Sequence, residues 1–161
     1  MAYPLFSFFK VIGLARTKFN VSKNQEKRSY DGVVYDSALE MRFYRDWILP
    51  KMESGEIVSC ERQIKYELQQ KFKHNDKNVL PINYVADFVT TDKDGKITVW
   101  DVKGQPDSVA LLKRKLFWFK YPDVDYRWVT YSKQDGGWLD YEYVKACRKQ
   151  RKKDREEKTD E

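Results

Sequence analysis

The sequence predicts a single α/β domain in which a mixed central sheet of four to five strands is flanked by helices. Two neighbouring runs, 83–90 and 96–103, are apolar on both faces, which is typical of a sheet that helices cover on both sides. Predicted helices and further strands alternate along the rest of the chain. A chain of 161 residues fits one such domain, which buries about 70 % of its unfolded surface without metal or disulfide staples.

The first half of the predicted domain contains one helix and one or two strands. Apolar residues repeat with helical spacing over 37–49, and Pro50 is expected to end that helix. Residues 56–62 and 64–72 have strand composition and form either one bent strand or a close pair of strands. A polar loop is expected at 71–78.

The second half begins with a predicted hairpin, whose turn at 92–95 joins the two apolar runs. Residues 104–107 then start a helix that runs through Tyr121, and residues 126–131 alternate as another strand. A final helix is expected over 138–153. This order of helices and strands supports the mixed sheet.

Composition divides the chain into an N-terminal extension at 1–29, a single domain at 30–153 and a charged tail at 154–161. The start of the extension is apolar, but Pro4 and Lys10 interrupt it, which favours neither a signal peptide nor a membrane span. We therefore expect no membrane association. The apolar start packs either on the domain or on a second chain, and the second interpretation implies a homodimer.

The charge of the chain favours a polyanionic partner. The formal net charge is +6, and the last eight residues contribute −3, which leaves +9 for the rest of the chain. Nucleic acid is the commonest polyanion that a basic intracellular protein meets. The cations of the final helix either follow a phosphate backbone or form an ordinary solvated surface, and we favour the second interpretation. Cys60 and Cys147 have no paired ligand spacing, and His74 is the only histidine, which indicates a reducing, cytoplasmic setting without structural zinc.

Asp87, Asp101 and Lys103 are charged residues inside the two apolar runs, where an unpaired charge costs several kcal/mol. In a hairpin centred on Asp94, the residue numbers of opposed partners sum to 188, which places Asp87 opposite Asp101. Opposed side chains have Cβ atoms roughly 5 Å apart, so the two carboxylates repel unless a cation or a proton lies between them. A divalent metal satisfies both, and Lys103 projects on the same face of the strand.

The alternation of side chains assigns the apolar residues of the hairpin to two faces. The face of the charged trio is expected to carry Val85, Val89, Ile97 and Val99. The other face is expected to carry Tyr84, Ala86, Phe88, Trp100 and Val102. An alternative to the metal site is a salt bridge between Asp87 and Lys103, with Asp101 at a solvated end of the sheet. A register shifted by one residue would also separate the two carboxylates.

Glu40 lies on the apolar stripe of the predicted first helix, and two interpretations fit it. Ser37 and Glu40 have the spacing of a capping box, in which the glutamate side chain reaches back to the Ser37 amide. Alternatively, the Glu40 carboxylate points at the sheet and completes the metal site or orients water. Both interpretations stand at this point.

This order of elements and acids resembles the PD-(D/E)XK nuclease superfamily, which implies a restriction-endonuclease-like core. Asp87 matches the first acid of its motif, and Asp101 to Lys103 match the (D/E)-x-K. Glu40 matches the acid on the preceding helix, and Ala86 replaces the nominal proline.

Four motifs further resemble a family of small uncharacterised phage and prophage proteins of this fold, over about residues 18–132. They are Tyr30-Asp-Gly-Val-Val-Tyr-Asp-Ser-Ala-Leu-Glu40, Tyr84-Val-Ala-Asp-Phe88, Asp101-Val-Lys-Gly104, and Leu112-Lys-Arg-Lys-Leu-Phe117 with Tyr121-Pro122. The first sixteen residues and the basic final helix lie outside this similarity.

The resemblance implies a metal-dependent nuclease site. Asp87, Asp101 and the backbone carbonyl of Val102 would coordinate Mg²⁺ or Mn²⁺ through hard oxygen ligands. Lys103 would polarise the attacking water and steady the scissile phosphate. Glu40 would bind a second metal or a metal-bound water.

Three further residues are candidates for contact with the substrate. Gln63 matches a glutamine of the resembling family and is expected to line the site. Lys113 and Lys115 either contact the DNA backbone or form the solvent face of their helix. The apolar residues beside them, expected to be buried, are Leu112, Leu116 and Phe119.

The function expected from these observations is a Mg²⁺- or Mn²⁺-dependent DNA endonuclease of phage type, acting in recombination, repair or replication in the host-cell cytoplasm. Branched DNA such as a Holliday junction is the favoured substrate, because small dimeric members of the superfamily resolve such junctions. The alternative is a non-catalytic nucleic-acid-binding or assembly protein on the same fold. An intact set of acids argues against that alternative, since buried acids repel phosphate. Cleavage of RNA is a third hypothesis.

Overall fold

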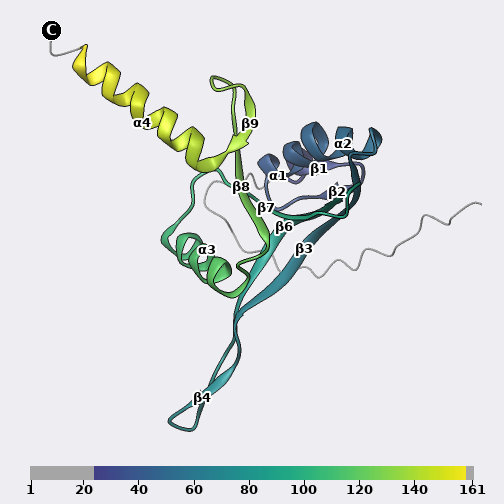
Figure 1. Cartoon of the computed structure of the whole chain (residues 1–161), viewed down its shortest axis with the longest axis vertical. Coiled ribbons are helices and arrows are strands. Elements are labelled where there is room, and N and C mark those ends of the chain that lie inside the picture. The colour runs from purple at the N-terminus through teal and green to yellow at the C-terminus, as the bar shows by residue number, and fades with distance from the viewer. Residues whose placement is uncertain (1–23, 159–161) are drawn as a thin grey trace, which may run out of the picture.

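A five-stranded mixed sheet forms the centre of the protein in a computed structural model that describes residues 24–158 (Figure 1). The strands, in the order in which they pair, are β3 (Ile57–Gln69), β6 (Ile82–Asp92), β7 (Ile97–Val102), β8 (Asp125–Ser132) and β9 (Gly137–Asp140). Only the pair of β7 and β8 is parallel. The predicted mixed sheet with flanking helices is confirmed. The apolar start of the chain, with its predicted packing contact, lies outside the described residues.

Helices cover both faces of this sheet. The first helical segment, on one face, comprises α1 (Ala38–Phe43), a π-helical turn η2 (Tyr44–Ile48) and α2 (Leu49–Glu53). On the other face, α3 (Ser108–Lys120) makes the crossover that the parallel pair of β7 and β8 requires. The last helix, α4 (Tyr141–Glu157), projects away from the sheet (Figure 1). None of the helices formed by residues 24–158 has the length and apolar character that a membrane crossing requires.

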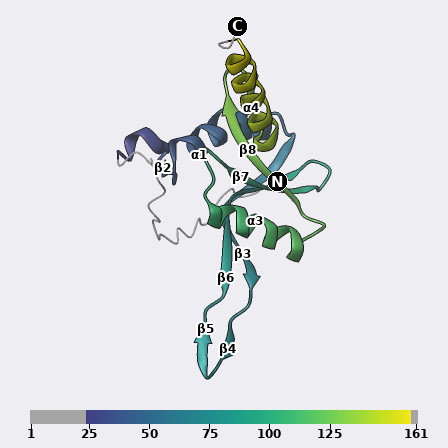
Figure 2. The same ribbon diagram turned by 90° about the vertical axis from the view of Figure 1, so that its left-hand side faces the viewer.

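The smaller elements lie at the edges of this core. They are η1 (Glu26–Arg28), β1 (Ser29–Tyr30), β2 (Val33–Val34), β4 (Phe72–His74) and β5 (Lys77–Val79). Strands β1 and β2 pair with each other, as do β4 and β5. The short pairs therefore form two hairpins, and that of β4 and β5 lies at the far end of the β3–β6 ribbon (Figures 1 and 2).

The register predicted for the central hairpin is confirmed. Phe88 pairs with Trp100 and Val89 pairs with Val99, as the turn predicted. The Oδ1 atom of Asp92 accepts hydrogen bonds from the backbone N–H groups of Asp94 and Lys96, both at 2.9 Å. This tight turn fixes the pairing of the strands that carry the acidic residues.

The first helical segment does not end at Pro50, contrary to the prediction, but continues to Glu53. Ser37 caps its start as expected, because the Ser37 Oγ accepts a hydrogen bond from the Glu40 backbone N–H at 3.1 Å. The π-helical turn η2 precedes Pro50, which lies in the first turn of α2. Pro50 has no N–H to donate to the preceding turn, and the chain forms the wider π-helical turn there, in which the Leu49 N–H donates to the Tyr44 carbonyl.

Most of the predicted run 56–72 forms the single strand β3 (Ile57–Gln69), which bends at Gln63, and Phe72 already belongs to β4. The backbone of Gln63 has φ = 55°, in the left-handed region that side chains other than glycine seldom adopt. The pairs on either side, Arg62 with Phe88 and Ile64 with Ala86, are regular, but Gln63 and Asp87 are not paired in the ladder. The antiparallel ribbon is therefore interrupted at the position of Asp87.

At this interruption the side chains exchange faces, which corrects the predicted assignment. Phe88 packs on the α1 side, with its ring 5.9 Å from that of Phe43. Tyr84 packs on the α3 side instead, with its ring 5.4 Å from that of Phe117. Unbroken alternation would place both on one face, so the left-handed backbone at Gln63 coincides with a rotation of the ribbon.

Two further predictions are wrong: the loop at 71–78 and the start of the helix at 138–153. The predicted loop at 71–78 is the hairpin of β4 and β5, which turns through Asn75 and Asp76 at φ = 45° and 60°. Two consecutive residues with positive φ give the type I′ turn that matches the twist of a hairpin. The predicted helix at 138–153 instead begins with strand β9, and α4 starts only after Asp140. The Asp140 carboxylate caps that helix by accepting from the Glu142 N–H at 2.9 Å.

Candidate active site

Asp101 is held from two sides within the sheet. Its side chain is almost fully buried, with 2 % of the residue exposed. The Lys103 ammonium lies 2.7 Å from Asp101 Oδ1, and the Tyr126 hydroxyl donates a hydrogen bond to Oδ2 at 3.2 Å. Asp101 and Lys103 thus lie on one side of β7, as the alternation of the strand predicted. The observed ion pair of Lys103 is with Asp101 rather than with Asp87.

Asp87 lies at the next position of the β6–β7 register after the pair of Phe88 and Trp100. Its Oδ2 atom accepts a hydrogen bond from the backbone N–H of Val102 at 2.8 Å. The carboxylate therefore occupies the place that a backbone acceptor of β6 would otherwise take. Asp87 is buried and lies against the residue that directly follows Asp101.

The backbone of Val102 presents its carbonyl toward the same side as Asp87. The Lys103 N–H donates to the Val129 carbonyl on β8 at 2.8 Å. In a trans peptide the carbonyl of one residue and the N–H of the next point in opposite directions. The Val102 carbonyl consequently points away from β8 and toward β6, the strand of Asp87. This orientation agrees with the prediction that the Val102 carbonyl oxygen coordinates a metal ion together with the carboxylates of Asp87 and Asp101.

Buried aromatic hydroxyl and indole groups surround Asp101. Trp128 is opposite Asp101 in the parallel pair, and its Nε1 donates to the Tyr126 hydroxyl at 2.6 Å. Burial, reinforced by the charge of Asp101, raises the pKa of Tyr126 well above its usual range. Burial likewise raises the pKa of Tyr84, with Asp101, Tyr126 and Asp87 adding to the effect. Both phenols therefore stay protonated at neutral pH.

Arg114 on α3 extends the site toward solvent. Its guanidinium lies 4.2 Å from the Trp128 ring centroid and donates to Glu142 of α4 at 2.6 Å. The Lys103 ammonium lies 5.2 Å from the centroid of the same ring. Both cations thus lie within cation–π distance of the Trp128 ring.

Sequence reasoning missed three of these residues: Arg114, Tyr126 and Trp128. The alternation of 126 and 128 on a strand parallel to the one with Asp101 was the available signal. It could be used only once the pairing of β7 with β8 was known. The sequence gives no such signal for Arg114. It is one of several basic residues on α3, and only its contacts in the folded protein distinguish it from them.

Glu40 is buried at the start of α1, which lies against β7. The Ser37 hydroxyl donates to the Glu40 carboxylate at 2.9 Å, so the serine and glutamate bond to each other, although through the hydroxyl rather than the Ser37 amide. Among residues 24–158, no three His, Cys, Asp or Glu side chains form a group that could hold a metal. Glu40 and Asp87 are both buried, and the role of Glu40 beside Asp87 and Asp101 stays a prediction.

A comparison with family models places this chain. The model described as a protein of unknown function, DUF1064, matches residues 17–136, about three-quarters of the chain. The chain belongs to the DUF1064 family. No curated protein matches the sequence. All the candidate site residues from Glu40 to Trp128 lie inside the DUF1064 match, whereas α4 lies outside it.

The residues predicted to contact the substrate differ in how far they are exposed to solvent. Gln63 is exposed at the bend of β3, at the register position opposite Asp87. On α3, Lys115 is exposed and Lys113 is partly buried. Leu112 and Phe119 are 56 % and 87 % exposed, so they do not form the buried face predicted for them. Phe117 is the fully buried residue of this helix, and Leu116 packs beside it.

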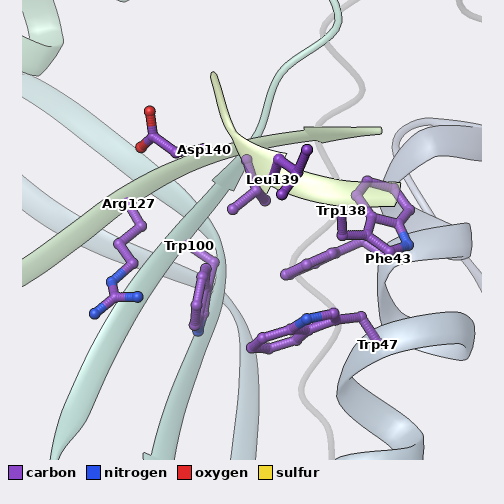
Figure 3. Close-up of a pocket in the computed structure, with 8 residues that line it drawn as sticks. Phe43, Trp47, Trp100, Arg127, Trp138, Leu139 and Asp140 are labelled. Carbon is purple, nitrogen blue, oxygen red and sulfur yellow. The ribbon is translucent and has the colours of Figure 1, made fainter. Parts of the chain in front are cut away.

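A pocket in the DUF1064 chain lies on the side of the sheet that α1 covers, where Phe43 and Trp100 line it (Figure 3). It is lined mainly by aromatic side chains, and Figure 3 shows Trp47 and Trp100 close together with Arg127 beside Trp100. Its other lining residues are Phe43, Val129, Trp138, Leu139 and Asp140. None of the predicted acids or lysines lines it, so this pocket and the acidic site are separate.

Proposed function

We propose that this DUF1064 protein is a metal-dependent phosphodiester hydrolase that cleaves DNA. The observation that carries the proposal is the juxtaposition of Asp87 and Asp101. These two buried carboxylates are opposed at the position that follows Phe88 and Trp100 in the β6–β7 register, and Lys103 contacts one of them at 2.7 Å. The resemblance of this set to the PD-(D/E)XK nucleases gives it a chemical interpretation.

The chemistry of the donor set fits Mg²⁺ or Mn²⁺. Both ions prefer hard oxygen ligands, and Mg²⁺ in phosphoryl-transfer sites is held by one or two carboxylates together with water and substrate phosphate. Asp87, Asp101 and the Val102 carbonyl supply such oxygens at the end of the β6–β7 ladder. A bound divalent ion would supply positive charge that offsets the charge developing on the phosphate.

The protein residues have separate tasks in this proposal. Lys103 would hold the attacking water and neutralise one phosphate oxygen, since only 15 % of its side chain is exposed and its charge is poorly screened. Asp87 is oriented by the Val102 N–H, and Asp101 is oriented by the Tyr126 hydroxyl. Glu40, buried on the neighbouring helix, would bind a second metal or a metal-bound water.

The nature of the substrate follows from charge and from the resemblance. The chain carries a net charge of +6, which favours a polyanion. Similarity to phage and prophage proteins points to an endonuclease for recombination, repair or replication intermediates in the host-cell cytoplasm. Branched DNA such as a Holliday junction is the substrate we propose, with a homodimer as the acting species.

A cleavage panel tests the proposal. Purified protein is incubated with supercoiled plasmid, single-stranded DNA and a four-way junction, each with Mg²⁺, Mn²⁺ or EDTA. We expect metal-dependent cleavage of at least one substrate, lost in Asp101→Ala and retained in Asp94→Ala, which removes an exposed acid of the hairpin turn. Equal cleavage by Asp101→Ala, or no cleavage of any substrate by the wild type, would overturn the proposal. Salt-sensitive binding without cutting would identify the non-catalytic alternative.

A further inference from the structure

Strands β3 and β6 continue beyond the sheet as a projecting ribbon that ends in the hairpin of β4 and β5. In Figures 1 and 2 the ribbon extends away from the helices and the rest of the sheet. We call residues 70–81 the arm. The register of β3 with β6 shifts between Glu67 and Gln69, and the pair after the shift, Gln69 with Ile82, is in register with Phe72 and Val79 of the hairpin.

The short gap between these strand pairs has a chemical cause. In the common register, Gln70 faces Pro81, and proline has no N–H to donate to the ladder. The type I′ turn at Asn75 and Asp76 then closes the ribbon with two residues. The arm is therefore one continuous two-stranded element.

The base of the ribbon is fixed to α3. The Tyr121 hydroxyl donates to the Glu67 carbonyl at 2.9 Å, and the Lys120 ammonium lies 3.4 Å from the Glu67 carboxylate. The Tyr66 ring packs 5.1 Å from that of Phe117. The arm thus leaves the body of the protein in a defined direction rather than from a loose loop.

The arm carries three exposed lysines. Lys71, Lys73 and Lys77 are exposed, and among the residues that the structure describes none has an ion-pair partner. The single acid of the arm is Asp76, which leaves a net charge of +2 on twelve residues. Many cations elsewhere are engaged, as Arg114 is by Glu142 and Arg127 is by Asp125. An unpaired basic ribbon this far from the core contributes nothing evident to the fold.

The distance of these lysines from the acidic site is set by the strand. A strand rises about 3.3 Å per residue, so Lys71 and Lys73 lie at most about 26 and 33 Å along the ribbon from Gln63, the position opposite Asp87. Lys77, paired with His74, lies at about 36 Å. One turn of duplex DNA is about 34 Å long, with about 10 base pairs. The arm therefore spans about one helical turn from the site.

We propose that the arm binds the phosphate backbone of duplex DNA about one helical turn away from the cleavage site. This inference rests on the proposed function for its choice of DNA as partner, and it assigns the arm the role of positioning the duplex. A two-stranded ribbon also fits within the major groove, which brings Lys71, Lys73 and Lys77 close to phosphates on its edges. Binding through phosphates positions the substrate without selecting its sequence.

Binding measured in EDTA separates this inference from catalysis. Fluorescence anisotropy with a labelled 30-base-pair duplex is recorded over a series of salt concentrations for the wild type and for the triple variant K71A/K73A/K77A. The control variant K27A/K133A/K158A removes the same charge from exposed lysines outside the arm. Far-ultraviolet circular dichroism and the melting temperature check that both variants fold like the wild type.

We expect the arm variant to bind the duplex at least about tenfold more weakly at low salt, with a log–log salt slope smaller by about 3, since each phosphate contact contributes about 0.9. The control should change the slope by less than 1. A series of duplexes in which the flank on one side is lengthened should show an affinity gain at about 8 to 11 base pairs that the arm variant lacks.

Equal salt slopes for the arm and control variants, or a length series without the step, would overturn the inference. An arm-dependent step seen with duplex RNA and not with DNA would overturn the choice of partner. A wild type that shows the step in EDTA, yet cuts no substrate of the cleavage panel with Mg²⁺ or Mn²⁺, would contradict only the proposed hydrolase. If the wild type and the arm variant cleaved long duplexes equally, and the wild type showed no step in the length series, only the arm inference would be contradicted.

Discussion

The carboxylate of Asp87 accepts a hydrogen bond from the backbone N–H of Val102 at 2.8 Å, across the two strands that carry the acidic residues. The bond lies where the β6–β7 ladder ends, after Phe88 and Trp100. A side chain thus completes the pairing that the backbone of β6 leaves open. The same bond fixes the direction of a carboxylate that we propose to act in catalysis, so structure and activity should respond differently to substitutions of Asp87.

Asp87→Asn should keep the fold and lose activity. The asparagine side-chain oxygen can still accept from the Val102 N–H, but the negative charge is gone. We expect the free energy of unfolding in urea to change by less than about 1 kcal/mol and cleavage to fall by at least about a hundredfold.

Asp87→Ala should lose stability as well as activity. The buried Val102 N–H would have no acceptor, which costs about 1–3 kcal/mol in the free energy of unfolding. Urea unfolding of the two variants side by side provides the measurement. If both variants were equally stable, the hydrogen bond would not have the structural role assigned to it.

Tyr126→Phe should destabilise the protein and weaken catalysis moderately. The lost hydroxyl donates to Asp101 and accepts from the buried Trp128 indole, which would be left without an acceptor. We expect a loss of about 1–3 kcal/mol in unfolding free energy and a fall of about tenfold in cleavage. Tyr131→Phe is the control, since that hydroxyl has no hydrogen bond among the described residues. Equal effects of the two substitutions would contradict the role given to Tyr126.

Gln63→Gly should raise the stability of the protein and lower its cleavage activity. Glycine adopts φ = 55° without strain, so Gln63→Gly should raise the free energy of unfolding by about 0.5–1 kcal/mol. Gln63→Ala keeps the strain and should give no such gain. If the amide contacts substrate, both variants lower cleavage equally. A stabilised glycine variant with full activity would show that Gln63 only shapes the bend.

Asp125 should make stability depend on pH in the acid range. Hydrogen bonding to Arg127, followed by Lys96, lowers the pKa of Asp125 to about 2 in the folded protein. Its pKa in the unfolded chain is about 3.9, so the stabilisation is present above about pH 4 and is lost as the pH falls toward 2.

Asp125→Asn should accordingly cost about 1–2 kcal/mol at pH 7 and almost nothing near pH 2. Urea unfolding across this range measures the difference between wild type and variant. Asp123→Asn, at an exposed acid nearby, is the control and should show no such convergence. A pH-independent difference for Asp125→Asn would mean that its ion pairs do not account for its effect.

The relation between Asp87 and Asp101 could be predicted from the sequence because a tight turn sets it. Asp92, Asp94 and Gly95 close the hairpin within four residues, and a two-strand register follows from the turn alone. The burial of both acids followed in the same way from their apolar neighbours. Local geometry was sufficient for both inferences.

The remaining features depend on departures from regular geometry or on contacts between distant segments. Alternation along a strand assumes an unbroken backbone, and the left-handed residue at Gln63 breaks it, which is why Tyr84 and Phe88 were assigned to one face. The arm was missed because Asn75 and Asp76 are polar and typical of any loop, although their positive φ angles make a hairpin. Roles for Arg114 and Trp128 required the packing of α3 on β8.

Binding of Mn²⁺ to the free protein tests the central claim most directly, because the claim is that Asp87 and Asp101 together hold a divalent cation. Electron paramagnetic resonance counts free Mn²⁺ during a titration of the wild type, Asp87→Asn, Asp101→Asn and the control Asp94→Asn. We predict that the wild type and the control bind Mn²⁺ with the same affinity and that each site variant binds at least about tenfold more weakly. Equal affinity in all four proteins would contradict the account.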